Sequence, residues 1–334
     1  MSRIACWLAA GMVALAGLTS AQAQQPAAPP EKVSLLLNWY LYSEHAPFFL
    51  GRERGYFAQE GIDLDIQEGR GSTPTVQAVA AGTVTFGYAD LSSAVKAAAV
   101  GAPVVVIGVL LQKSPMAVMG LSERNIRTPQ DMRGRTVALT PGDSLSQVWP
   151  LLLKKTGLSE SDVKVIGGDM QTKLNAVING QVDLMLGYLM DQNMRIENAT
   201  KKPVHVIPFS DYGVNLVSSS IIASKETVTA KSDLVRRFMR AATRAVEEAE
   251  KNPEAAVDAM LKANIKAGDR DSLIRGLKLT IPLYHTAETQ SLRPFRVSPE
   301  SIADSLTMLS EYGGLDKTAP ARARDFVILD FLPN

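Results

Sequence analysis

Short apolar runs alternate along the chain with longer segments whose apolar residues recur at helical spacing. In the first third, strands are predicted at 33–37, 62–66, 86–88 and 104–111, with helices at 46–53, 75–81 and 91–100. The last of these strands is apolar throughout, which is typical of a strand that is buried on both faces. The strand–helix–strand order predicts a parallel sheet with right-handed crossovers.

The same alternation is repeated further along the chain. Residues 117–121 are predicted to begin the crossing into a second lobe, with strands at 136–139, 163–166, 184–186 and 204–207 and helices at 145–155, 171–179 and 191–199. A strand at 218–223 is expected to return to the first lobe. After Lys231, helices are predicted at 234–251, 253–263, 270–279, 299–312 and 319–328, which fits a cover for that lobe.

The pattern therefore predicts an α/β protein with two lobes and a helical C-terminal tail. The first lobe is expected to comprise 32–119 and 214–334, and the second lobe 120–213. Two chain crossings between lobes form a hinge, the arrangement that closes around small ligands. A chain of 334 residues, 46% of them hydrophobic, is long enough to bury two such cores.

The N-terminus has the pattern of a cleaved secretory signal at 1–23. Arg3 supplies the positive start, 4–18 is apolar, and Ala-Gln-Ala at 21–23 is a small-x-small cleavage site. An uncleaved anchor is the alternative, although the apolar run is short for a membrane span. Residues 24–31 are predicted to be a disordered tether. We therefore expect the mature protein in the periplasm.

Composition argues against several classes of protein. The only cysteine, Cys6, lies in the predicted signal, so the mature chain has no thiol for a disulfide, a nucleophile or a metal site. Without Arg3, 34 basic residues balance 34 acidic ones and no basic block stands out, so nucleic acid is not an expected partner. The three histidines do not cluster, and neither a metal nor a cofactor is expected.

Two segments, 79–90 and 177–191, share a helix-like run, a small-residue turn and a strand that ends at Gly-Tyr before an acid. Ligands of open α/β sheets bind beyond the carboxyl ends of strands, so Tyr88 and Tyr188 are expected to face one cleft from opposite sides. Chance recurrence of the pattern is the alternative. The acids of these segments either accept hydrogen bonds from an amino-substituted ring or cap the following helices.

Asn38 and Trp39 end the first predicted strand. The indole could stack on a planar ligand, or it could plug the core below the sheet edge. His45 is predicted near the start of the first helix, with Ser43 as its cap and Pro47 in its first turn. The helix dipole would then keep His45 neutral. This histidine either faces the cleft or lies behind it or at the surface.

Two turns, at 71–74 and 140–144, lead into predicted helices. Ser72 lies in the first turn, and Thr140 and Ser144 lie in the second. Hydroxyl groups beside the unpaired N–H groups of a helix N-terminus can bind anions or polar head groups. Capping of the same helices explains these residues equally well.

The first ninety residues carry a denser set of motifs, namely Asn38-Trp39, His45-Ala-Pro47-Phe-Phe, Gly55-Tyr-Phe-x-x-Glu-Gly-Ile-Asp-Leu64, Val79-Ala-Ala-Gly82 and Phe86-Gly87. On these motifs the chain resembles the nitrate/taurine-type periplasmic solute-binding family. It is most similar to the branch that handles thiamine pyrimidine precursors, which shares the Asn-Trp and His-x-Pro elements. The resemblance implies a type II periplasmic binding protein fold and delivery of a small molecule to the membrane permease of an ABC importer.

The same branch contains an enzyme, the eukaryotic pyrimidine synthase, which consumes its own histidine and a pyridoxal phosphate held by a lysine. The resemblance places Ala89 at the lysine position, Ser93 at the histidine position and 217–220 at its cysteine cluster. No other lysine or reactive base is expected in the cleft, so a binding protein is expected rather than an enzyme. The usual glutamate of the pyrimidine-binding relatives is also absent, and Asp191 or Gln192 is the candidate to replace it.

The expected function is capture of a small planar nitrogen-containing solute, such as a thiamine pyrimidine precursor, by a monomer. The candidate ligand-binding residues are Asn38, Trp39, His45, Ser72, Tyr88, Asp90, Thr140, Ser144, Tyr188 and Asp191. The aromatic side chains would stack on the ring, and the amide, imidazole and carboxylate groups would bond its edge. The alternative ligand is a small anion such as a sulfonate or nitrate, held by helix N-termini, which the nearby acids oppose by charge repulsion.

Overall fold

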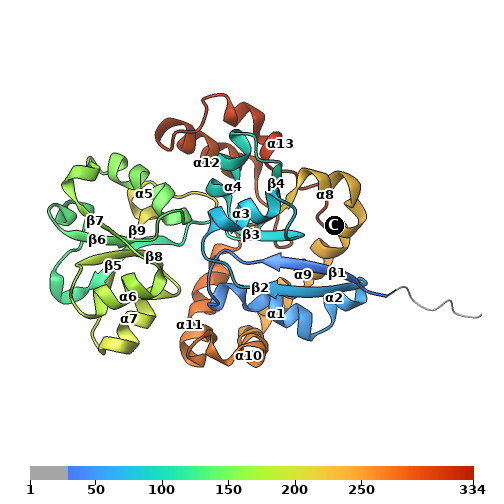
Figure 1. Cartoon of the computed structure of the whole chain (residues 1–334), viewed down its shortest axis with the longest axis horizontal. Helices are drawn as coiled ribbons and strands as arrows, with labels where there is room; N and C mark the ends of the chain where they lie inside the picture. Colours follow the sequence, from blue (N-terminus) through green and yellow to red (C-terminus); the bar gives the residue numbers. More distant parts are fainter. Residues whose placement is uncertain (1–28) are drawn as a thin grey trace, which may run out of the picture.

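The computed structural model describes residues 29–334, which form two α/β lobes (Figure 1). The predicted signal peptide at 1–23 and residues 24–28 of the predicted tether lie outside the described residues. The first strand begins at Glu31, the last residue of the predicted tether. Within 29–334, no helix combines the length and the apolar character that crossing a membrane requires.

The first lobe contains a mixed sheet in the order β2-β1-β3-β10-β4. Strands β1 (Glu31–Leu36), β2 (Ile62–Gln67) and β3 (Phe86–Asp90) run parallel, as the alternation predicted. Strand β10 (Ser219–Ser224) lies between β3 and β4 (Val104–Val109) and runs antiparallel to both. The four strands predicted in the first third of the chain are therefore parallel to one another, and the strand that returns from the second lobe is antiparallel to them.

The second lobe repeats this arrangement in the order β7-β6-β8-β5-β9. Strand β6 (Thr136–Leu139) pairs in parallel with β7 (Lys164–Gly167) and β8 (Leu184–Tyr188). Strand β5 (Met116–Leu121), which brings the chain into this lobe, runs antiparallel to β8 and β9 (Val204–Pro208). Each sheet thus contains one strand that arrives from the other lobe and runs against its neighbours.

Helices cover both sheets. Those of the first lobe before the crossing are α1 (Ala46–Glu53), α2 (Tyr56–Gln59), α3 (Ser72–Ala80) and α4 (Leu91–Ala99). Those of the second lobe are α5 (Ser144–Lys155), α6 (Met170–Ile178) and α7 (Gln192–Thr200). The chain then continues through α8 (Lys225–Ala230), α9 (Ser232–Lys251), α10 (Pro253–Ala263), α11 (Arg270–Thr280), α12 (Pro299–Tyr312) and α13 (Ala323–Phe326).

The C-terminal helices pack against the first lobe, as Figure 1 shows. On α9, Phe238 stacks on Phe86 of β3, with 4.1 Å between the ring centroids. The prediction of a final helix at 319–328 is wrong beyond Phe326. There Val327 forms a parallel bridge with Val106 of β4, and the Ile328 N–H donates to the Val106 carbonyl at 2.9 Å. The open edge of β4 offers hydrogen bonds that replace the helix.

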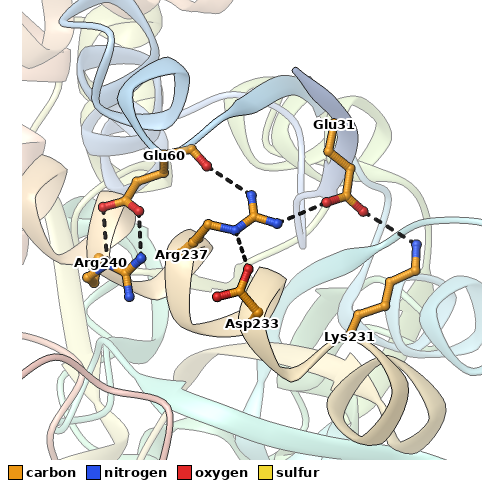
Figure 2. A network of polar contacts seen from close by, with 6 residues as sticks. All are labelled: Glu31, Glu60, Lys231, Asp233, Arg237 and Arg240. Atoms are coloured by element: carbon orange, nitrogen blue, oxygen red, sulfur yellow. Dashed lines mark hydrogen bonds and ion pairs between the residues drawn. The ribbon is translucent and has the colours of Figure 1, made fainter. Parts of the chain in front are cut away.

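A network of ion pairs joins α9 to the start of β1 (Figure 2). Arg237 contacts Glu31 at 3.0 Å and Asp233 at 2.7 Å, and Arg240 binds both carboxylate oxygens of Glu60 at 3.1 and 2.7 Å. Most of these side chains are partly exposed, so each pair adds little stability by itself. The network lies at the amino end of β1, opposite the end that carries the candidate site.

Candidate functional site

The loop after β2 fixes the backbone at the carboxyl end of β1. The Gly69 N–H donates to the carbonyl of Trp39 at 3.1 Å, and the Gly71 N–H donates to that of Asn38 at 2.9 Å. A Cβ atom on Gly69 would lie 1.8 Å from the Leu37 carbonyl oxygen, so glycine alone permits this close approach. Asn38 and Trp39 are therefore held in place by backbone contacts that do not depend on their side chains.

His45 holds the Asn38 side chain by a hydrogen bond. Its Nε2 donates to Asn38 Oδ1 at 2.8 Å, and the ring is fully buried. Burial lowers the pKa of His45 to about 3, so the predicted neutral imidazole arises from desolvation rather than from a helix dipole. The predicted cap is wrong, because Ser43–His45 forms a 3₁₀ turn before α1 and the Ser43 hydroxyl makes no capping bond.

A small cavity lies where the strand ends of the two lobes meet. Its empty space is about 360 Å³ including its mouth. The first lobe lines it with Asn38, Trp39, Tyr42, Gly71 and Ser72. The second lobe lines it with Asp143, Ser144, Leu145, Lys173, Tyr188 and Gln192. Five of the ten candidate residues therefore meet here: Asn38, Trp39, Ser72, Ser144 and Tyr188.

The hydroxyl groups at the cavity already contact neighbours. Ser144 Oγ and the Tyr188 hydroxyl lie 3.0 Å apart, and Ser72 Oγ accepts the Asp90 N–H at 3.1 Å. Among residues 29–334, no group of three His, Cys, Asp or Glu side chains is placed to hold a metal ion. The cavity is thus built from aromatic, hydroxyl, amide and charged side chains of the two lobes.

In the first lobe, the two candidates from the repeated Gly-Tyr motif, Tyr88 and Asp90, do not line the cavity. Tyr88 is fully buried and donates its hydroxyl to Glu44, so the prediction that it faces the cleft is wrong. Asp90 is also fully buried and caps α4, accepting the Ser92 N–H at 2.9 Å and the Ser218 hydroxyl at 2.7 Å. The capping role that the sequence left open for Asp90 is the one observed.

Asp191 and Thr140 do not line the cavity. Asp191 pairs with Arg195 at 2.7 Å, accepts the Gln192 side-chain amide at 2.6 Å and makes no capping bond to α7, so the capping role is not observed. Thr140 is buried, and its hydroxyl has no hydrogen-bond partner. Gln192 does line the cavity, and its Oε1 accepts the Tyr188 N–H at 2.6 Å. Of the two candidates to replace the missing glutamate, only Gln192 is at the site.

The sequence analysis missed a buried charge pair in the cavity wall. Lys173 on α6 is 1% exposed, and its Nζ lies 3.7 Å from Asp143 Oδ2 and 3.1 Å from the Leu186 carbonyl oxygen. Burial lowers the pKa of Lys173 and raises that of Asp143, and the charge of each partly offsets the shift of the other. The expectation that no lysine reaches the cleft is therefore wrong. The sequence feature that could have revealed Lys173 is its position three residues after Met170, on the apolar stripe of a predicted helix.

A second missed group, Glu44, contacts the cavity residue Tyr42. It is fully buried and accepts the hydroxyl of Tyr42 at 2.6 Å and that of Tyr88. Burial raises the pKa of the Glu44 carboxyl, and the two phenol hydrogen bonds oppose this rise. Glu44 does not line the cavity, so its contacts support Tyr42, which does.

The lobes touch on both sides of the cavity. On one side, Gln147 of α5 donates to the hydroxyls of Thr73 at 2.7 Å and Ser93 at 3.1 Å. On the other side, the Asn198 amide of α7 donates to the Ser272 hydroxyl of α11 at 2.7 Å. These bonds join residues of different lobes, so the structure represents a closed arrangement.

Two mixed sheets, two crossings and a cavity between the strand ends define a type II periplasmic binding protein fold. The alkanesulfonate-binding protein SsuA from Xanthomonas axonopodis pv. citri, solved with MOPS, aligns with a TM-score of 0.68 at 17% identity over 90% of this chain and 99% of that chain. The nitrate-binding protein NrtA from Synechocystis PCC 6803 aligns with a TM-score of 0.66 at 12% identity, covering 90% of this chain and 87% of that chain.

The family follows from sequence comparison. The NMT1/THI5-like profile matches residues 42–256, and the chain belongs to this family. It is similar to the 4-amino-5-hydroxymethyl-2-methylpyrimidine phosphate synthase of Legionella pneumophila, with 26% identity over 79% of both chains. It is also similar to the riboflavin-binding protein RibY of Chloroflexus aurantiacus, with 27% identity over 80% of this chain and 77% of that one. The formylaminopyrimidine-binding protein of Halalkalibacterium halodurans shares 25% identity over 69% of this chain and 70% of its own.

Proposed function

We propose that this protein is the periplasmic substrate-binding component of an ABC importer. It captures a small planar nitrogen-containing solute, such as a thiamine pyrimidine precursor, and passes it unchanged to a membrane permease. The observation that carries the proposal is the closed cavity at the strand ends, walled by Trp39 from one lobe and by a compensated charge pair from the other. An indole wall suits a flat ring, and a wall without net charge suits a neutral solute.

The names of two relatives support this class of ligand. The proteins named for formylaminopyrimidine and riboflavin both take flat nitrogen heterocycles. The cavity is small even with its mouth included, which favours the smaller, single-ring type of solute. We therefore place an aminopyrimidine ahead of a flavin as the ligand.

Binding without chemistry is favoured over pyrimidine synthesis, although several relatives, among them the Legionella pneumophila protein, are named as synthases. Position 89 holds a buried alanine, and Ser93 accepts a hydrogen bond from Gln147 between the lobes. The cavity lysine, Lys173, already donates to a backbone carbonyl and faces the Asp143 carboxylate. Burial lowers the pKa of Lys173, but the Asp143 charge opposes this and favours the ammonium over the neutral amine that acts as a nucleophile.

A small anion is the second candidate ligand, because the Lys173 ammonium and the N-terminus of α5 both lie at the cavity. The Asp143 carboxylate caps the same helix end and opposes an anion there. The two candidates therefore make opposite predictions about charged ligands.

The test begins with mass spectrometry of small molecules released from purified protein. Thermal-shift assays with aminopyrimidines, riboflavin, alkanesulfonates and nitrate follow, on the wild type and on Trp39→Ala. We expect a shift with an aminopyrimidine that Trp39→Ala abolishes while its circular dichroism spectrum stays native. A shift with anions alone would support the second candidate. Conversion of the bound molecule, or formation of a pyrimidine from added pyridoxal phosphate, would show an enzyme instead.

A further inference from the structure

The two carboxylate oxygens of Asp143 have different surroundings. Oδ1 accepts the Ser146 N–H at 2.7 Å and thereby caps α5. Oδ2 is buried and has no hydrogen-bond partner, although Asp143 lines the cavity and is only 4% exposed. A buried carboxylate oxygen without a donor is unfavourable, so a donor supplied by a ligand would be strongly preferred at this position.

Lys173 compensates the charge of this carboxylate without occupying its free oxygen. The Nζ atom lies 3.7 Å from Oδ2, which is within ion-pair range and beyond hydrogen-bond distance. The same ammonium donates to the Leu186 carbonyl at 3.1 Å and lies 5.3 Å from the centre of the Trp39 ring. Lys173 is thus fixed by groups other than Oδ2, which leaves that oxygen open to a ligand.

We propose that Asp143 is the specificity-determining residue of the cavity, and that its Oδ2 accepts a hydrogen bond from an amino group on the edge of the ligand. Lys173 is a positioning residue that keeps the carboxylate ionised and in place. This inference rests on the proposed function and deepens it. The Oδ2 acceptor selects neutral rings that carry an exocyclic amino group over rings that carry an oxo group at the same position. An oxo oxygen is itself an acceptor, so it cannot donate a hydrogen bond to Oδ2.

The selection is measured by calorimetric titration with 4-amino-5-hydroxymethyl-2-methylpyrimidine and its 4-oxo analogue. We expect the wild type to prefer the amino compound by at least tenfold. Asp143→Asn retains an oxygen for the helix cap but places a neutral amide at the cavity. The preference should fall in this variant to within about threefold. The matched control is Asp169→Asn, because Asp169 caps α6 in the same way, accepting the Thr172 N–H at 2.8 Å, and does not line the cavity.

The positioning role of Lys173 is tested by Lys173→Met. Without the ammonium, nothing offsets the rise that burial causes in the pKa of the Asp143 carboxyl, so it should take up a proton at a higher pH than in the wild type. Affinity for the amino compound should then fall more in Lys173→Met than in the wild type as the pH is lowered from 8 to 6. A merely structural lysine would lower affinity equally at both pH values.

The outcomes separate the inference from the proposed function. A wild type that binds neither pyrimidine contradicts both. A wild type that binds the two compounds equally well contradicts the inference alone, even if no variant folds. The inference is also overturned if Asp143→Asn keeps the same preference as Asp169→Asn.

Discussion

The Lys173 ammonium lies 5.3 Å from the centre of the Trp39 ring, although the two residues belong to different lobes. A cation over an indole face at this distance is attracted by the ring. Because the two residues belong to different lobes, this contact forms only when the lobes are closed. It therefore couples the position of Lys173 in the cavity wall to closure of the lobes. Trp39 is partly buried and takes part in both the expected ligand contact and the contact between lobes.

Trp39 should therefore report binding by fluorescence. The described residues contain two tryptophans, Trp39 at the cavity and Trp149 in the core of the second lobe. In Trp149→Phe, addition of ligand should shift or quench the remaining emission, because the surroundings of Trp39 change. In Trp39→Phe, the emission of Trp149 should stay constant. A response in the second variant and none in the first would remove Trp39 from the site.

The hydrogen bonds of Gln147 should stabilise the closed form. Gln147→Ala removes the bonds to Thr73 and Ser93, each of which contributes about 1 kcal/mol or less net. We expect affinity to fall by about 3- to 10-fold, mainly through faster dissociation in stopped-flow measurements. Gln171→Ala is the control, because Gln171 is exposed and bonds only Asn175 within α6. Equal dissociation rates for the two variants would argue against a closing role.

His45 should make the fold sensitive to acid. Its pKa is about 3 in the folded state and about 6.5 when unfolded, so between these values only the unfolded chain binds the proton. Stability therefore falls as the pH falls, by about 2 kcal/mol at pH 5 from this residue alone. Urea unfolding should therefore show that His45→Gln loses about 2 kcal/mol less stability than the wild type between pH 7.5 and pH 5.

His285 provides a control of opposite sign. Its hydrogen bond to Glu250 at 3.1 Å raises its pKa, so this histidine contributes stability at low pH that is lost as the pH rises through its folded pKa. Replacing it with glutamine should enlarge the loss of stability between pH 7.5 and pH 5. If the two histidine variants changed the pH dependence of the unfolding free energy in the same direction, these assignments would be contradicted.

Gly69 should matter to both stability and binding. In Gly69→Ala, the new methyl group would collide with the Leu37 carbonyl, and the loop that holds Asn38 and Trp39 would have to move. We expect a lower melting temperature together with an affinity at least tenfold weaker. Gly82→Ala has open space for its methyl group but a φ of +69°, so it should cost about 1 kcal/mol of stability and leave affinity unchanged. A Gly69→Ala protein that binds normally would show that the loop does not set the site.

The sequence predicted the fold better than the site, and particular residues explain why. The strand-end rule correctly placed Asn38, Trp39 and Tyr188 at the cavity, because strand ends follow from the local pattern. The same rule failed for Tyr88, because the buried Glu44 beside it could not be foreseen from chain spacing. Lys173 was missed because lysines on helices usually face solvent, and only the tertiary fold brings it beside Asp143.

Strand exchange between the sheets also affects the order in which the two sheets can be completed as the chain emerges from its N-terminal end. The five strands of the second sheet all lie between Met116 and Pro208, whereas the first sheet lacks the strand between β3 and β4 until residues 219–224 have emerged. The lobe that begins later in the chain is therefore the first whose sheet is complete. The lobe that begins the chain must wait, with β3 and β4 separated by an open gap, until its partner has been made.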